Sequence, residues 1–153
     1  MISRRRRTEV LVESDRAVAL GLAALVCSEV EATDLARPRQ GLVMCEVRET
    51  ARGSRFYLGE ALMSESRVRI GETEGLGVVL GSDAELARAL AVVDAACALL
   101  VPLACAGAIE EGIASAEHDL AARRVHEAAL TGTSRVSFDT MGGQDMSVQV
   151  VAR

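Results

Sequence analysis

The chain has 153 residues, half of them apolar, and a formal charge of −5 at pH 7. This length and apolar content fit a single domain over residues 1–153 with a sizeable core, and the acidic balance argues against a nucleic-acid binder. All 17 basic residues are arginine, which binds phosphate and carboxylate well, although a compositional bias of the genome explains this more simply.

The first 30 residues are predicted to form helices that pack on a sheet formed later in the chain. Four arginines at positions 4–7 followed by the apolar residues 17–27 are similar to a secretory or twin-arginine signal. The segment between them is acidic, which such signals are not, so we expect a cytoplasmic protein that makes no membrane contact. The arginines should form a solvated, partly frayed arm. A short helix over 6–12 and a helix over 15–27 with Ser14 as its N-cap should follow.

The middle of the chain predicts an antiparallel sheet. Four stretches carry strand-like apolar patterns and are separated by short turns: 41–49, 55–63, 67–71 and 76–80. Residues 32–40 contain Pro38 and are expected to form a connection. The predicted fold class is therefore α+β, with an antiparallel sheet of about four strands and N-terminal and C-terminal helices packed on it.

Two helices are predicted after the sheet. Ser82 to Glu85 (SDAE) has the sequence of a capping box, with Ser82 as the N-cap. An apolar stripe at helical spacing follows, and Pro102 should end or kink the helix. The stripe consists of Leu86, Leu90, Val93, Cys97 and Leu100. A second helix is expected over about 106–130, and its inner face would be Ile109, Ile113, Ala116 and Leu120.

Residues 95–109 carry no charge but are too short to span a membrane comfortably, so we expect them in the core or at a subunit interface. This uncharged run, together with an alanine-rich core in a chain of only three aromatic residues, predicts that the isolated chain self-associates or is poorly soluble. Residues 134–141 alternate like a strand, and residues 146–153 could form a strand or a tail.

Two features suggest binding chemistry but favour structural explanations. The glycines of residues 75–81 (GLGVVLG) are similar to a phosphate-binding loop, yet Val78 and Val79 make this segment itself a strand, so turns around a strand are favoured. The cysteines lack the spacing of a metal site and are expected to be buried free thiols. They are Cys27, Cys45, Cys97 and Cys105. We expect no metal on this chain.

Arginines on the sheet are the best candidates for a binding site. Arg67 and Arg69 are two residues apart on a predicted strand and should point to the same face. Arg55 or Arg48 on neighbouring strands could join them and hold a phosphate-rich ligand or an acidic partner. An exposed polar face without a ligand is the simpler explanation. No catalytic residue can be assigned.

Several separated blocks of sequence resemble the G-subunit family of the bacterial carbon–phosphorus lyase core complex. The likeness spans residues 10–141, and the four arginines at 4–7 and the apolar run 95–109 depart from it. The blocks are Arg55-Phe56, Gly59-Glu60, Val68-Arg69, Leu76-Gly77, Gly81 with Asp83, and residues 134–141 (SRVSFDTM).

The resemblance implies a role in phosphonate catabolism. In that family the G subunit assembles with the H, I and J proteins, and with the I, H and L proteins it supports displacement of adenine from ATP by methylphosphonate. ATP would then be a substrate of the complex, and this chain would bind no cofactor. Catalytic residues are expected on the I subunit and the iron–sulfur chemistry on another subunit. The alternative function is a free-standing homo-oligomeric module that binds an anion or regulates another protein.

Overall fold

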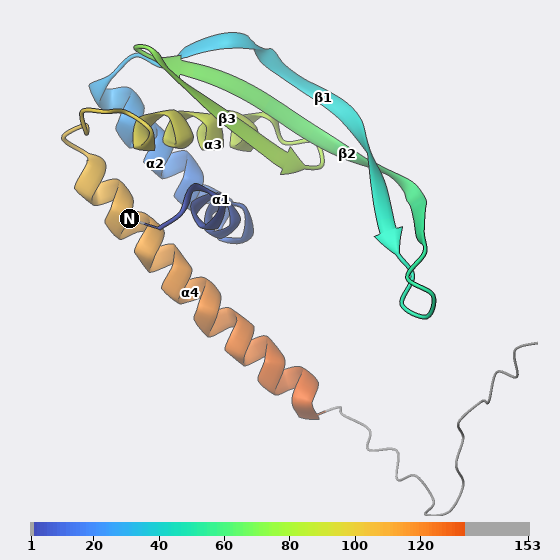
Figure 1. The fold of residues 1–153 in the computed structure, drawn as a ribbon. Coiled ribbons are helices and arrows are strands. Elements are labelled where there is room, and N and C mark those ends of the chain that lie inside the picture. The colour runs from blue at the N-terminus through green and yellow to red at the C-terminus, as the bar shows by residue number, and fades with distance from the viewer. Residues whose placement is uncertain (1, 134–153) are drawn as a thin grey trace, which may run out of the picture.

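The computed structural model describes residues 2–133, which form four helices and one sheet. Figure 1 shows helices α1, α2 and α3 on one side of the sheet, with α4 running away from it. The elements are α1 (Arg4–Glu13), α2 (Arg16–Glu29), β1 (Thr33–Arg48), β2 (Arg55–Ile70), β3 (Thr73–Leu80), α3 (Ala84–Cys97) and α4 (Ala106–Thr133). The predicted α+β class is confirmed. The strands expected over 134–141 and 146–153 lie outside the described residues.

The sheet is antiparallel in the order β1-β2-β3, with three strands rather than about four. The second and third predicted strands are one continuous strand, β2. The connection predicted for residues 32–40 is wrong, because β1 already begins at Thr33. Pro38 is tolerated there because β1 is an edge strand and its register with β2 shifts between Ala36 and Arg39.

Helices α2 and α3 each begin one residue later than the sequence predicted, whereas α4 begins at Ala106 as expected. The N-cap of α2 is Asp15 rather than Ser14, and that of α3 is Asp83 rather than Ser82. The Asp83 carboxylate accepts a hydrogen bond from the Leu86 amide at 2.9 Å, whereas the Ser82 hydroxyl accepts one from the Gln40 side chain at 2.6 Å. A carboxylate caps as well as a hydroxyl does, so the pattern alone cannot separate the two neighbours.

The core is centred on α3, which packs on β2 and β3 and is buried on almost every side over residues 89–96. Small residues make this close contact possible. A Cβ atom on Gly75 would lie 2.0 Å from the Ala91 carbonyl oxygen, and one on Gly77 would lie 1.8 Å from that of Ala87. These glycines therefore serve helix packing within strand β3, and α3 occupies the space that a phosphate would need.

The buried faces of the other helices test the predicted stripes. The stripe of α4 is confirmed, since Ile109, Ile113, Ala116 and Leu120 are all buried. In α2 helical spacing predicts a stripe of Leu20, Ala23, Ala24 and Cys27, but the buried residues lie one position earlier, at Ala19, Leu22, Ala23 and Val26. Leu100 is fully exposed because α3 already ends at Cys97, so the apolar residues 95–109 are split between α3, a loop and α4. Within residues 2–133, no helix is long and apolar enough to cross a membrane.

The distal part of the β1–β2 hairpin extends beyond the helices. Strand β3 ends at Leu80, which pairs with Met63, so residues 41–62 form a two-stranded extension with the turn at its tip (Figure 1). We call residues 41–62 the arm, and the three-stranded part of the sheet with α1, α2 and α3 the body. Many large apolar side chains of the arm are exposed.

Candidate functional site

The arginines predicted as a site lie in two separate places. Arg67 and Arg69 share the outer side of β2, since the residues that alternate with them, Val68 and Ile70, are buried on the helix side. Arg55 pairs in register with Arg48 near the tip of the arm. Twelve residues of strand separate Arg55 from Arg67, about 40 Å at roughly 3.3 Å per residue. Arg55 therefore does not join the other two.

Each of these arginines has a carboxylate partner. Arg67 lies 3.0 Å from Glu65, Arg69 pairs with Glu74, and Arg55 lies 3.2 Å from Glu46. Hydrogen bonding from Arg39 and then from Arg67 lowers the pKa of Glu65. Because the pairs are exposed they contribute little stability, and an anion that bound here would compete with the carboxylates for the guanidinium groups.

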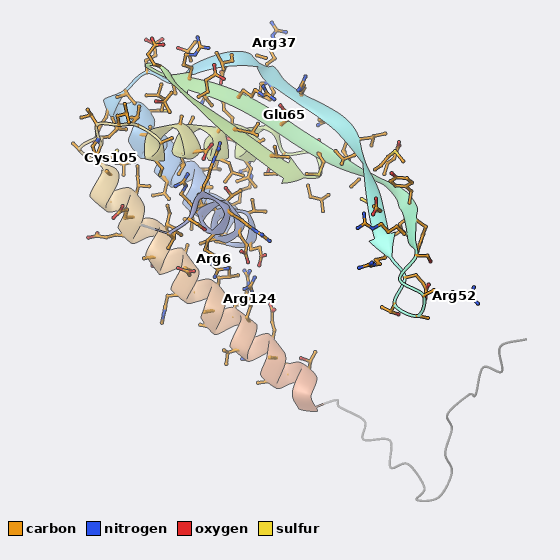
Figure 2. All side chains as sticks on the ribbon, in the orientation of Figure 1. Arg6, Arg37, Arg52, Glu65, Cys105 and Arg124 are labelled. Atoms are coloured by element: carbon orange, nitrogen blue, oxygen red, sulfur yellow. The ribbon has the colours of Figure 1, made fainter. Side chains whose placement is uncertain are left out.

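The structure adds arginines that the sequence interpretation did not place in the site. Arg39 shares Glu65 with Arg67, at 3.1 Å, because β1 extends back along β2. Arg37 projects from the side of the sheet away from the helices, and Arg52 projects from the tip of the arm (Figure 2). The feature that the sequence does not reveal is the first half of β1, residues 33–40, which contains Pro38 and for which a connection is predicted.

The four N-terminal arginines lie in helix α1 of the folded body, so the expectation of a frayed N-terminal segment is wrong. Arg7 is only 6% exposed and donates to the Asp94 carboxylate at 3.0 Å. Arg4 donates to the same carboxylate at 2.8 Å. Arg6 bonds Glu117 at 2.7 Å, so α1 is tied to α4 as well, and Figure 2 shows Arg6 and Arg124 where these helices face each other.

Asp94 is the buried centre of this cluster, on α3. It also accepts a hydrogen bond from the Leu76 amide of β3 at 3.0 Å. Burial by itself would raise the pKa of Asp94, but the hydrogen bonds from Arg4, Leu76 and Arg7 together hold the pKa below its usual value. Asp94 is thus ionised at neutral pH and joins α1, α3 and β3.

A pocket of about 270 Å³ opens beside this cluster, between the start of α1, the end of α3 and the start of α4. Its lining is mainly apolar. The charged groups around it are Arg7, Glu110 and Glu117, of which Arg7 is bonded to Asp94 and Glu117 to Arg6. The apolar lining comes from Ile2, Ala96, Cys97, Leu99, Pro102, Leu103, Ala106, Ile109, Ile113 and Ala114.

The cysteines are free, but only Cys105 is buried; Cys45 and Cys97 are partly buried and Cys27 is exposed, which corrects the expectation that all four are buried. Burial raises the pKa of the Cys97 thiol, so it is protonated and weakly nucleophilic at neutral pH. Residues 2–133 contain no group of three or more histidine, cysteine or acidic side chains arranged to hold a metal ion.

Comparisons with known proteins identify the family. The family described as "Phosphonate metabolism protein PhnG" matches residues 2–143, nearly the whole chain. The chain belongs to the PhnG family. A PhnG protein of Rhizobium meliloti (strain 1021), named as a subunit of alpha-D-ribose 1-methylphosphonate 5-triphosphate synthase, is 38% identical over 105 residues. This match covers 68% of the chain and 65% of that relative.

For this PhnG family member, the match begins at residue 2 and therefore includes the four arginines of α1. Arg4 and Arg7 hold Asp94, so α1 is part of the fold that the family match covers. The match also includes the whole arm and all the residues that line the pocket.

Proposed function

We propose that this chain is a scaffolding subunit of the enzyme that makes alpha-D-ribose 1-methylphosphonate 5-triphosphate, and that it works together with the H, I, J and L proteins of the same system. The similarity to the Rhizobium meliloti synthase subunit is the observation that carries this proposal. In the reaction, an oxygen of methylphosphonate forms a bond to C1′ of the ribose of ATP. The bond from C1′ to the base breaks, and adenine leaves with a proton.

This chemistry needs a group that protonates the leaving base and cations beside the triphosphate. The described part of the chain offers arginines for the second task. For the first, the charged groups at the apolar pocket are mostly held in ion pairs, Arg7 with Asp94 and Glu117 with Arg6. These arrangements support a scaffolding role with at most an electrostatic share in a site completed by other subunits.

The test measures adenine by chromatography. With ATP and methylphosphonate, the lone chain should release no adenine. A mixture of the H, I, J and L proteins should release adenine only when this chain is added. Adenine release by the lone chain would refute the scaffolding role. Full turnover by the partner proteins without this chain would refute its membership of the enzyme.

We propose that Arg67 and Arg69 bind a partner subunit or an anionic ligand. Arg55 is a separate candidate for the same role, on the arm. The double variant Arg67→Ala/Arg69→Ala should weaken assembly or turnover while the melting temperature stays nearly unchanged, because both side chains are exposed. Arg5→Ala, at an exposed position of α1, is the control and should change neither. Normal assembly and turnover of the double variant would remove these arginines from the site.

The alternative, a free-standing module that binds an anion, makes a different prediction. Such a module would bind ATP or methylphosphonate by itself, and calorimetric titration of the lone chain would detect it. We expect no binding to the lone chain, because Arg39, Arg67 and Arg69 already have carboxylate partners.

A further inference from the structure

One side of the arm carries large apolar side chains that no described helix covers. In the register of the hairpin, Leu42 lies opposite Leu62. Both side chains are on the side of the sheet that, further along β2 in the body, carries Ser64 and Ser66 and faces α3. Met44 lies on the same side, and so does Tyr57, which pairs with Glu46. Leu42 and Tyr57 are each 63% exposed. This side of the sheet therefore changes from buried to bare where the body ends.

The cause of this change is the length of the covering elements. Helix α3 begins at Ala84, just after β3 ends opposite Met63, and it runs back over β2 and β3. The last hydrogen bond on that edge of β2 runs from the Gly81 amide to the Leu62 carbonyl oxygen, at 2.7 Å. Within residues 2–133, nothing pairs with this edge of β2 from Arg55 to Ala61. A two-stranded hairpin of this kind is only marginally stable in water by itself.

The composition of the arm is that of an interface. The whole chain contains three aromatic residues, and two of them, Phe56 and Tyr57, are consecutive residues of the arm that face its two opposite sides. Aromatic side chains are enriched in the centres of protein interfaces. The charges of residues 41–62 cancel, with three arginines and three glutamates. A partner of the arm would therefore be recognised by apolar contact and main-chain pairing rather than by charge.

The exposed area is large enough for a specific complex. Seven large apolar side chains of the arm are at least 38% exposed: Leu42, Val43, Met44, Phe56, Tyr57, Leu58 and Leu62. They lie on both sides of the arm, since Val43 and Phe56 are on the side opposite Leu42. Their combined exposed area is on the order of several hundred Å², which compares with about 800 Å² per partner in a standard interface and with roughly 300–600 Å² for the largest apolar patch of a typical monomer.

We propose that the arm is where this chain binds another subunit of the synthase, which adds an extended apolar segment as a strand along the free edge of β2. The main chain of that segment pairs with β2 from Arg55 to Ala61, and its side chains pack beside Tyr57 and Leu62 of β2. The rest of the same subunit covers Leu42 and Met44 on the neighbouring strand β1. Strand addition of this kind draws affinity from main-chain hydrogen bonds and specificity from alternate side chains. The proposal rests on the proposed function, since it takes the partner from the same enzyme.

The test uses the full chain co-produced with the H, I and J proteins. The double variant Leu42→Ser/Tyr57→Ser should weaken co-purification at least about tenfold, as loss of two central interface side chains does. The matched control, Leu100→Ser/Val101→Ser, removes two exposed apolar side chains of the loop before α4 and should assemble normally. Circular dichroism melts should show that both variants are folded.

Hydrogen exchange locates the contact directly. The amides of residues 55–61 that point to the free edge of β2, rather than to β1, should exchange at least about tenfold more slowly in the complex than in the lone chain, because main-chain pairing protects them. Normal assembly of the arm variant, or no protection of these amides, would overturn the proposal and leave the proposed function standing. If the unaltered chain fails to assemble, the proposed function falls and this inference falls with it.

The lone chain distinguishes the other possible occupants of the arm. Light scattering gives its mass, and exchange is followed at the same concentration. Protection of these free-edge amides in a monomer would mean that other residues of the same chain cover the arm. Protection in a dimer that is lost on dilution would mean that a second copy covers it. Either result overturns the proposal, whereas rapid exchange in the lone chain supports it.

Discussion

The body and the arm share strands β1 and β2, but apolar surface is covered in the body and exposed in the arm. In the body, β3 meets α3 through glycines and alanines, and Gly75 and Gly77 bring the strand so close that no Cβ would fit. In the arm, Leu42, Met44 and Tyr57 are large and more than half exposed. Small residues thus mark an interface that is completed within the chain, and large exposed ones mark an interface that needs another molecule.

The charges differ in the same way. The body contains a buried carboxylate, Asp94, held by Arg4, Arg7 and the Leu76 amide. The ion pair of the arm, Arg55 with Glu46, lies at the surface, where water and salt weaken it. Substitutions in the body should therefore change the free energy of unfolding, and those in the arm should leave it nearly unchanged.

The largest effect is expected from Asp94→Ala, which should lower the free energy of unfolding by about 3–5 kcal/mol, because it leaves Arg7 buried without its partner. Urea denaturation at neutral pH measures it. Asp34→Ala is the matched control, since Asp34 forms an exposed pair with Arg88, and it should cost less than about 1 kcal/mol. Equal effects of the two variants would contradict the difference between buried and exposed pairs.

The same carboxylate should appear in the pH dependence of stability. The pKa of Asp94 is lower in the folded chain than in the unfolded one, so its contribution is complete above the unfolded value of about 3.9 and is lost as pH falls through the folded value. Asp94→Asn should therefore be less stable at neutral pH but lose less stability on acidification. Parallel profiles of the two proteins would show that Asp94 is not the titrating group.

Gly77→Ala should destabilise the body by about 1–3 kcal/mol, because the added methyl group forces β3 away from the carbonyl of Ala87. Gly41→Ala makes the same change at the start of the arm, where nothing lies within 4 Å of the added carbon. It should leave the free energy of unfolding nearly unchanged. A tolerant Gly77 would mean that β3 and α3 are not in close contact.

Asp83→Ala should cost about 1 kcal/mol through loss of the N-cap of α3. Ser82→Ala should cost less, because the Ser82 hydroxyl accepts its hydrogen bond from the exposed side chain of Gln40. Thermal melts of the two variants rank them. A larger loss for Ser82 would restore the capping box that the sequence alone predicted.

The smallest effect is expected from Met44→Ser in the arm. Met44 is already 56% exposed, so the free energy of unfolding should change by less than about 0.5 kcal/mol. Val68→Ser, at a fully buried position of β2, should cost several times more. A costly Met44→Ser in the monomer would mean that the arm is already covered within the chain, and the comparison between the two regions would fail.

Local patterns predicted much of the fold. The spacing of Ile109, Ile113, Ala116 and Leu120 identified the buried face of α4, because one helix period fixes which residues share a face. Alternation identified the sheet, but it could not show that residues 55–63 and 67–71 are one strand. The interruption, Ser64 to Ser66, is polar; yet Ser64 and Ser66 are buried, and the Ser64 hydroxyl is bonded to the Gly81 carbonyl oxygen and the Asp83 amide.

The candidate site was less predictable, because its members are far apart in the chain. Alternation correctly placed Arg67 and Arg69 on one side of β2. The register of β1 then brought Arg39 to Glu65 and carried Arg55 to the far end of the arm. Register depends on the bulge near Pro38, which has no reliable local signal, and on the shift after Cys45. Cys45 pairs with Gly59, and a glycine inside a strand is a local sign of such a bulge.

The sequence by itself determined the fold class, the buried face of α4 and the family, because periodicity and short blocks of residues are local properties of the chain. Only the tertiary structure decided that Arg4 and Arg7 meet Asp94, about 90 residues away, and that β3 and α3 stop short of the arm. An apolar strand residue has the same pattern whether or not a helix covers it. Burial depends on where the covering elements end, and this is set by contacts between distant segments.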